Sequence, residues 1–303
     1  MNSKSIIFLI LFSLFITIIS STAVSFESDG EGYTIEDNIL TITGKEILVD
    51  ASCTLNLNEF SLSNSGSLTP LLISSGKQVN LVLKDYTTFT DSPNNEHEGT
   101  IYLEDGATLT ISGTRVLIIN PKKLMGINGT TSTSLIVNDG PTIKIQSTSG
   151  NIGCIYLRKA ITFNDVILTC SVKGEKHSID SEGTIKLIRG TYYIGSSGGK
   201  GIKSENNLYI GEENGSDSLL DLTIDTNNIG IVAKQIKIYS GKILIFVDKD
   251  GIKAASSGKV CNKETVHCSG NCTCYINYKG GKMFLTSGEV GLDSNGDITI
   301  TGG

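Results

Sequence analysis

A short phrase recurs along this chain at the same place in a longer unit, and it constrains the fold more than any other feature of the sequence. The phrase reads GIKS at Gly201–Ser204, GIKA at Gly251–Ala254 and GLDS at Gly291–Ser294. Each copy is followed some residues later by a run rich in β-branched or aromatic side chains, such as Ile298–Ile300. A repeat of this kind means that one supersecondary unit stacks on itself.

The apolar residue after the small turn residue serves as an anchor for aligning the units. The anchors are Ile101, Ile127, Ile155, Ile179, Ile202, Ile231, Ile252 and Leu292. Most intervals between anchors are about 21 to 29 residues long, which is typical of one coil of a β-solenoid. Within the units, runs such as Ile143–Ile145 and Ile236–Ile238 alternate apolar and polar residues, so their aliphatic side chains share one face of a strand.

An antiparallel sandwich and a parallel β-helix both fit such strands, and the residues around the anchor distinguish them. A sandwich has hairpin spacing without columns of like residues at one register. Here the position before the anchor is nearly always small, and its occupants are Cys154, Ser178, Gly201, Gly230, Gly251 and Gly291. Stacked coils place equivalent residues directly above one another, so columns of small residues suit sharp corners. The sequence therefore predicts an all-β, single-stranded parallel β-helix of about eight to ten coils.

The first residues predict export of the chain. Lys4 supplies a positive charge, Ile6–Ile19 is apolar, and Ser21–Ala23 offers a cleavage site, so residues 1–23 are typical of a signal peptide. The alternative is a membrane anchor, but the apolar run is shorter than the ~20 residues that a spanning helix needs. No later segment is long and apolar enough to span a bilayer. We therefore expect a secreted protein, located outside the cell or on its surface.

The charge balance excludes some partners and suits others. The formal net charge is -6 and no run rich in Lys or Arg occurs, so the sequence gives no basis for nucleic-acid binding. An acidic surface suits cations. Three acceptor motifs for N-glycosylation agree with export, and they begin at Asn128, Asn214 and Asn271.

Seven cysteines are present, and four of them cluster near the C-terminal end. The clustered residues are Cys261, Cys268, Cys272 and Cys274. In an exported protein such a cluster predicts two local disulfides, with three possible connectivities. The rival interpretation is a zinc site that includes His267, although the spacing matches no common zinc pattern. Cys154 and Cys170 can also pair, which leaves Cys53 over.

We expect one domain over residues 24–303. Its coils are irregular over residues 24–98 and regular over 99–303, and the cysteine-rich insert occupies 259–275. The sequence ends at Gly303, in the middle of a unit and without a visible cap. A solenoid needs a cap over its last coil, so truncation of the chain is favoured over capping by a partner.

The repeat phrases, together with Asp250 and the stretch Asn295–Gly303, resemble a family of secreted bacterial carbohydrate-binding β-helix proteins. The repeats of that family read Asp-Gly-Ile-Lys-Ser, then an alternating strand, then Gly-Gly-Thr. The resemblance is good over residues 178–303 and thematic over 99–177. It implies a right-handed parallel β-helix that binds acidic pectic polysaccharide or cellulose and holds calcium ions. The family's shape is similar to that of pectate-lyase-type enzymes.

Acidic residues at two successive turns are the candidates for calcium binding. They are Asp248, Asp250, Asp293 and Asp297. Calcium takes six to eight oxygen ligands, and stacked turns could bring these carboxylates together. The alternative is that each aspartate only forms a turn by bonding its own backbone.

Lys203 and Lys253 share the position just after the anchor with Asp180 and Asp293, and they are the candidate contacts for a uronic-acid chain. The alternative is charge matching between neighbouring coils, which contributes little energy on a solvated surface. A lyase would need one of these lysines as a base with a lowered pKa. Their neighbours in sequence are neutral and rich in Gly and Ser, and they supply no such perturbation.

Tyrosines that could contact sugar rings are few, and Tyr192 and Tyr193 are the chosen candidates. As an alternative, both are strand residues whose rings pack on a pleated surface. The resemblance thus implies a polysaccharide-binding protein associated with calcium, and we expect it to be monomeric. A lyase on the same scaffold and a cell-surface adhesion solenoid are the two alternatives.

Overall fold

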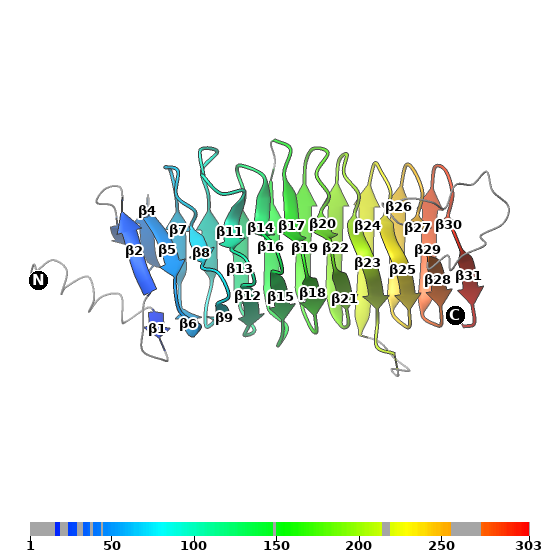
Figure 1. The fold of residues 1–303 in the computed structure, drawn as a ribbon, viewed down its shortest axis with the longest axis horizontal. Helices are drawn as coiled ribbons and strands as arrows, with labels where there is room; N and C mark the ends of the chain where they lie inside the picture. The colour runs from blue at the N-terminus through cyan, green and yellow to red at the C-terminus, as the bar shows by residue number, and fades with distance from the viewer. Residues whose placement is uncertain are drawn as a thin grey trace, which may run out of the picture.

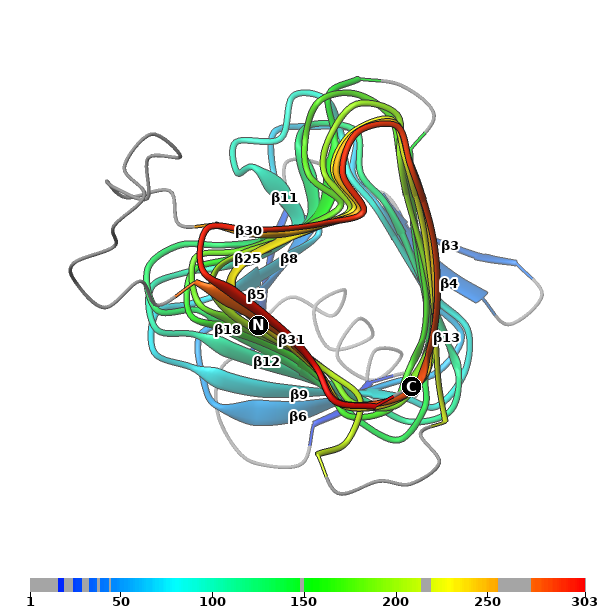
Figure 2. The ribbon, with the colours of Figure 1, turned by 90° about the vertical axis from the view of Figure 1, so that its right-hand side faces the viewer.

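The chain winds into an elongated coil of stacked strands (Figure 1). The computed structural model describes residues 16–18, 24–28, 33–36, 39–43, 45–147, 150–213, 219–255 and 274–302, and side chains from residue 46 onward. These residues form strands and no helix, and hence no helix that could cross a membrane. About nine turns follow one another in the right-handed sense (Figures 1 and 2). The predicted all-β parallel β-helix is confirmed.

Each regular turn contributes a strand to each of three faces. The first face contains β5 (Lys45–Val49), β8 (Leu71–Ile73), β11 (Gly99–Leu103), β14 (Met125–Gly129), β17 (Gly153–Leu157), β20 (Ile179–Ser181), the beginnings of β23 (Ile202–Ile210) and β25 (Ile231–Ile238), β27 (Ile252–Ala254) and β30 (Leu292–Ser294). The second face contains β6 (Cys53–Leu57), β9 (Gln78–Leu83), β12 (Thr108–Ser112), β15 (Ser134–Val137), β18 (Ala160–Phe163), β21 (Thr184–Leu187), the ends of β23 and β25, β28 (Tyr275–Tyr278) and β31 (Asp297–Ile300).

The third face is a separate sheet. It contains β4 (Ile39–Thr43), β7 (Phe60–Ser63), β10 (Thr87–Thr90), β13 (Val116–Asn120), β16 (Thr142–Gln146), β19 (Ile167–Val172), β22 (Gly190–Ser196), β24 (Leu220–Thr226), β26 (Lys242–Val247) and β29 (Lys282–Ser287). Three further strands pair antiparallel at the N-terminal end, namely β1 (Ile16–Ile18) on β6, β2 (Val24–Ser28) on β5 and β3 (Tyr33–Glu36) on β4.

The predicted anchors form one column inside the coil. Successive strands of the first face pair in parallel so that Ile127 lies beside Ile155, then Ile179, then Ile202. These side chains are at most 1% exposed. Along each strand, residues that point inward alternate with residues that point outward, as the alternation of buried and half-buried residues in β12 shows. The core is therefore a set of aliphatic columns that run along the axis.

The small residue before the anchor is required by the corner between the third and first faces. A Cβ atom on Gly201 would lie 2.6 Å from the carbonyl oxygen of Gly230, and one on Gly230 would lie 2.7 Å from that of Gly251. Both distances are shorter than any real Cβ contact, and the obstacle is the backbone of the next coil. The small-residue column is thus a consequence of close stacking.

This close approach predicts a stability difference between two glycines of the same column. Gly230→Ala should destabilise the fold by about 1–3 kcal/mol, because the added methyl group forces the coils apart. In Gly291→Ala the new Cβ has no neighbour nearer than 3.4 Å, and the free energy of unfolding should change little. Denaturant unfolding of both variants measures this. Equal destabilisation by both substitutions contradicts the explanation.

The cysteines fall into three groups. Cys154 in β17 and Cys170 in β19 form a disulfide across the core, with a Cα–Cα distance of 6.0 Å. This is the pair that the sequence analysis named. Cys53 is the buried free thiol, and burial raises its pKa. Cys274 is also buried. The predicted disulfides of the cluster depend on Cys261, Cys268 and Cys272, which lie outside the described residues.

The turn that leads into β11 is held by buried polar contacts. Asn95 is 0% exposed and donates its side-chain N–H to the carbonyl oxygen of Gly99 at 3.0 Å. Asp91 is 2% exposed and accepts the backbone N–H of Lys122 from the next coil. Burial raises the pKa of Asp91 to about 6, although the bonds to Lys122 and Asn95 oppose this shift. The carboxylate is therefore costly to ionise in the folded chain.

This raised pKa predicts how stability depends on pH. The folded state holds the proton of Asp91 more tightly than the unfolded state, so its contribution to stability is complete below about pH 4 and is lost as the pH rises through about 6. Asp91→Asn retains an acceptor for Lys122 and should stabilise the protein at pH 7 by up to ~3 kcal/mol, with no gain at pH 3.5. Thermal unfolding against pH tests this, with the exposed Asp165→Asn as control. A gain that is the same at both pH values overturns it.

Candidate functional site

A row of polar and aromatic side chains runs along the first face. Because the strands pair in register, the outward residues Tyr102, Asn128, Tyr156, Asp180 and Lys203 occupy equivalent positions in five successive strands. Neighbouring strands are ~4.8 Å apart, so the row is about 19 Å long. It runs across the strands, along the axis of the coil.

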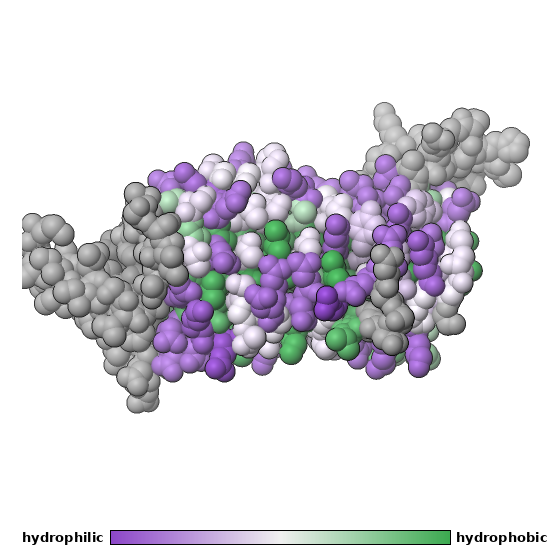
Figure 3. Space-filling view, turned by 90° about the horizontal axis from the view of Figure 1, so that it is seen from below, coloured by the Kyte–Doolittle hydropathy of each residue, from purple (hydrophilic) through white to green (hydrophobic). Residues whose placement is uncertain are grey.

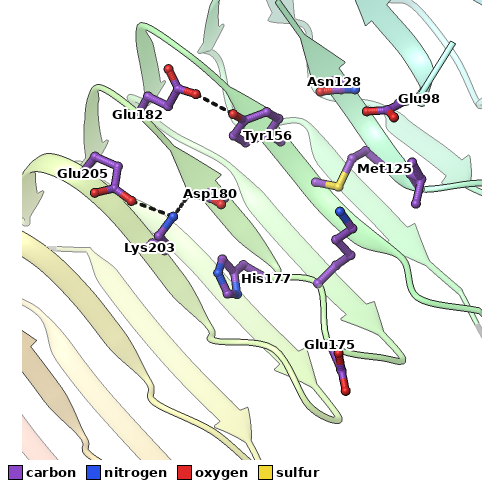
Figure 4. Close-up of a pocket in the computed structure, with 12 residues that line it drawn as sticks. Glu98, Met125, Asn128, Tyr156, Glu175, His177, Asp180, Glu182, Lys203 and Glu205 are labelled. Carbon is purple, nitrogen blue, oxygen red and sulfur yellow. Dashed lines mark hydrogen bonds and ion pairs between the residues drawn. The ribbon is translucent and has the colours of Figure 1, made fainter. Parts of the chain in front are cut away.

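Loops at both ends of these strands turn the row into the floor of a groove (Figure 4). Glu98, Glu175 and His177 come from the turns that enter the face. At the opposite corner, Glu182 follows β20 and Glu205 lies within β23, at the register shift between its two halves. The hollow has a volume of about 500 Å³. Five carboxylates and two ammonium groups line it, so the groove is acidic.

Two side chains of the floor, Asn128 and Asp180, have a buried oxygen without a hydrogen-bond partner among the described residues, and the one of Asp180 lies 3.5 Å from Nζ of Lys203. Asn128 is 5% exposed, and its Oδ1 atom accepts no hydrogen bond from the described residues. A buried amide oxygen without a partner costs free energy comparable to a lost hydrogen bond. This acceptor in the groove suits a donor brought by a ligand, such as a hydroxyl group.

Tyr156 lies beside Asn128 in the next strand, and hydrogen bonding fixes the orientation of its ring. Its hydroxyl donates to Oε1 of Glu182 at 2.6 Å, and the same oxygen lies 3.5 Å from Nε of Arg158. Burial and the bond to Glu182 both raise the pKa of Tyr156, so the phenol stays protonated. One half-buried ring and one oriented carboxylate are therefore presented to the groove.

Lys203 lies between two carboxylates of neighbouring positions. Its Nζ is 2.7 Å from Oε1 of Glu205 and 3.5 Å from Oδ1 of Asp180 in the preceding coil. Burial lowers the pKa of Lys203, but the hydrogen bond to Glu205 and the negative charge of Asp180 raise it by more, so the net shift of its pKa is upward. Lys203 lines the groove, but it serves first as the counter-charge of these two acids, and its contact with a uronic-acid chain stays a prediction.

His177 is a neutral member of the groove wall. Its Nδ1 accepts the backbone N–H of Lys200 at 3.2 Å, so the proton of the ring is on Nε2. Burial, and then the charges of Lys200 and Lys203, lower its pKa to about 4. His177 therefore offers a neutral N–H donor at physiological pH.

Two of the four predicted calcium ligands, Asp250 and Asp293, lie on either side of a lysine. Nζ of Lys253 lies 2.8 Å from Oδ2 of Asp250 and 2.7 Å from Oδ2 of Asp293. Asp248 and Asp297 are exposed. No group of three or more His, Cys, Asp or Glu side chains in the described ranges could hold a metal ion. The ammonium group of Lys253 thus occupies the place between two of these carboxylates, and calcium binding at them stays a prediction.

The pairing of Lys253 predicts a stability effect. Asp250 is 5% exposed, and the hydrogen bonds to Asp250 and Asp293 raise the pKa of Lys253. Lys253→Met leaves two shielded carboxylates without a cation and should destabilise the fold by about 2–3 kcal/mol. Lys249→Met, at an exposed position, is the control. Denaturant unfolding at pH 7 measures both, and equal values for the two variants contradict the proposed pairing.

The remaining predicted contacts lie apart from the groove. Tyr192 is 1% exposed, packs against Phe163 at a ring-centroid distance of 5.8 Å, and donates its hydroxyl to the carbonyl oxygen of Arg189. Its choice as a sugar contact was therefore wrong, because the outward position of β22 belongs to Tyr193, which is 43% exposed on the third face.

Of the three glycosylation motifs, Asn128 is the one whose asparagine is described, and its side chain is buried in the groove. Asn214 and Asn271 lie outside the described residues, so glycosylation stays a prediction.

Several residues of the groove were not singled out from the sequence. Tyr156 had no distinguishing neighbour in sequence, and His177 seemed to be an isolated surface histidine. Glu182 and Glu205 follow the anchors Ile179 and Ile202 by the same three residues. That repeated spacing is the signal that could have identified them as a pair in one wall.

Comparison with known proteins identifies the family of the chain. Neither the curated proteins nor the solved structures contain a match to the chain. A family model described as carbohydrate-binding domain-containing protein matches residues 21–303. Since this match covers nearly the whole chain, the protein belongs to that family of carbohydrate-binding domain-containing proteins.

Proposed function

We propose that this protein is exported and binds a linear polysaccharide lengthwise in the groove of the first face. The observation that carries the proposal is the Asn128 amide in the lining of the groove, whose buried oxygen accepts no hydrogen bond from the described residues. The part of the floor that lines the hollow, from Asn128 to Lys203, spans about 14 Å across four strands, which suits several sugar units in a row more than a single one. Tyr156 and the neutral His177 add a ring and an N–H donor on the same line.

The charge of the groove favours a neutral chain. Carboxylates outnumber ammonium groups by five to two in its lining, and Lys203 is already paired. Carboxylates accept hydrogen bonds from sugar hydroxyls strongly, whereas they repel the carboxylates of a uronic-acid chain. A cellulose-like polymer is therefore the proposed ligand. A calcium ion can bridge two carboxylates, so an acidic pectin-type chain would bind in this groove only with calcium present.

The lyase alternative needs a lysine that is poised to accept a proton. The pKa values of Lys203 and Lys253 are both raised, since each ammonium group lies between two carboxylates. This is the opposite of the shift that a catalytic base requires. We propose binding without cleavage.

Affinity for defined oligosaccharides tests the proposal. The full chain is titrated calorimetrically with cello-oligosaccharides, and with oligogalacturonates in the presence of calcium or of a chelator. Asn128→Ala removes the acceptor that the ligand satisfies and should weaken cello-oligosaccharide binding about tenfold, the effect of one hydrogen bond. The control is Asn120→Ala, since Asn120 lies on the third face and bonds Thr90.

The outcomes separate the alternatives. The proposal is supported if the protein binds cello-oligosaccharides and if Asn128→Ala weakens this binding while Asn120→Ala leaves it unchanged. Absence of binding to every neutral oligosaccharide rejects it. If incubation with polygalacturonate yields an unsaturated product that absorbs in the ultraviolet, the protein is a lyase instead.

A further inference from the structure

A second hollow lies on a different side of the molecule from the groove. It opens on the second face, where β21, β23 and β25 end, and has a volume of about 630 Å³. Figure 2 shows that the first and second faces meet at a corner of the coil, so the two hollows point in different directions. Figure 3 shows the molecule from below, where hydrophilic side chains are interspersed with separate hydrophobic ones.

Two lysines and a tyrosine alternate in the outward column beside this hollow. Strand pairing places Lys186 beside Tyr209, and Tyr209 beside Lys237. The Nζ atoms lie 5.8 Å (Lys186) and 5.6 Å (Lys237) from the centroid of the Tyr209 ring. Attraction between a cation and the ring holds both ammonium groups in place, two coils and about 10 Å apart.

Two further tyrosines border the same column. The ring of Tyr239 lies parallel to that of Tyr209, with centroids 6.4 Å apart. Tyr275 lies on the other side of Lys237, whose Nζ is 5.9 Å from its ring centroid. The hydrogen bond to Tyr275 raises the pKa of Lys237, so this ammonium group stays charged.

The acidic residues of this hollow are neutralised by other cations. Glu212 pairs with Arg189 at 2.6 Å, and Glu213 pairs with Lys279 at 3.7 Å. Among the ion pairs of the described residues, none includes Lys186 or Lys237. Two fixed positive charges are thus left for a ligand, on a surface that also offers tyrosine rings and hydroxyls.

We infer that the second face carries a separate binding site for an anionic saccharide chain, centred on Lys186, Tyr209 and Lys237. The two ammonium groups bind acid groups on units of a chain that runs along the axis. Tyrosine rings pack against the apolar faces of sugar rings, and their hydroxyls reach the polar edges. The charged group of the ligand is a carboxylate or a sulfate.

The inference does not depend on the groove. The groove is acidic and centred on Asn128, whereas this site is basic and lies around a corner of the coil. Each site can therefore be removed without the other, and failure of one leaves the second proposal intact.

Calorimetry with two anionic probes tests the inference. The full chain is titrated with oligogalacturonate and with a sulfated dextran oligomer, both with chelator and at low ionic strength. The double variant Lys186→Gln/Lys237→Gln should lose at least about tenfold in affinity, because both charge contacts with the ligand are removed. Added salt should weaken wild-type binding far more than binding by the variant.

Matched variants complete the experiment. Lys144→Gln removes an outward lysine of the third face and should leave anion binding unchanged. Tyr209→Leu removes the ring between the lysines and should weaken binding about fivefold, while the exposed Tyr86→Ala should not. Asn128→Ala should reduce cello-oligosaccharide binding alone.

Preference between the two probes identifies the acid group. The inference is overturned if neither probe binds, or if Lys186→Gln/Lys237→Gln binds as the wild type does with an unchanged melting temperature. Equal loss in Lys144→Gln also overturns it, because the effect then reflects total charge.

Discussion

Register between successive coils is the constraint on which the rest of the structure depends. Parallel pairing at ~4.8 Å places each residue directly above its equivalent, and the corner before the anchor brings the backbones of neighbouring coils so close that a Cβ on Gly201 or Gly230 would lie 2.6–2.7 Å from a carbonyl oxygen. Small residues at this corner keep the register, and the register turns single positions into columns. The aliphatic columns form the core, and the outward columns form the surface of each face.

The same constraint explains why charges on the first face occur in pairs. An outward lysine cannot avoid the residue above or below it, so Lys203 lies against Asp180 and Lys253 against Asp293. In each case a second acid from the same strand or turn, Glu205 or Asp250, completes the set. The lysines thus become part of the scaffold, and the amide oxygen of Asn128 is left without a hydrogen-bond partner among the described residues.

Prediction from sequence was most successful where the repeat could be read. The anchors from Ile101 to Leu292 and the outward position of Lys203 and Lys253 follow from periodicity. The pairing of Cys154 with Cys170 was expected on a different ground, because these two cysteines lie outside the C-terminal cluster. Prediction was least successful for Tyr192, because adjacent tyrosines in a strand point to opposite sides and only the phase of the strand decides which one is buried. The groove was also missed, since its walls come from separate coils, with Glu98, Glu175 and Glu205 far apart in the sequence.

The sequence by itself determined that the chain is all-β, that it stacks as a parallel coil and which residues face inward, because these properties depend on local periodicity and on the size of repeated residues. Tertiary structure alone decided which loops rise beside the first face, which carboxylates each lysine meets, and that Lys186, Tyr209 and Lys237 form one column. The reason is physical: contacts between coils join residues more than 20 positions apart, and the length of each turn, which varies from coil to coil, decides where side chains outside the repeat phrase lie.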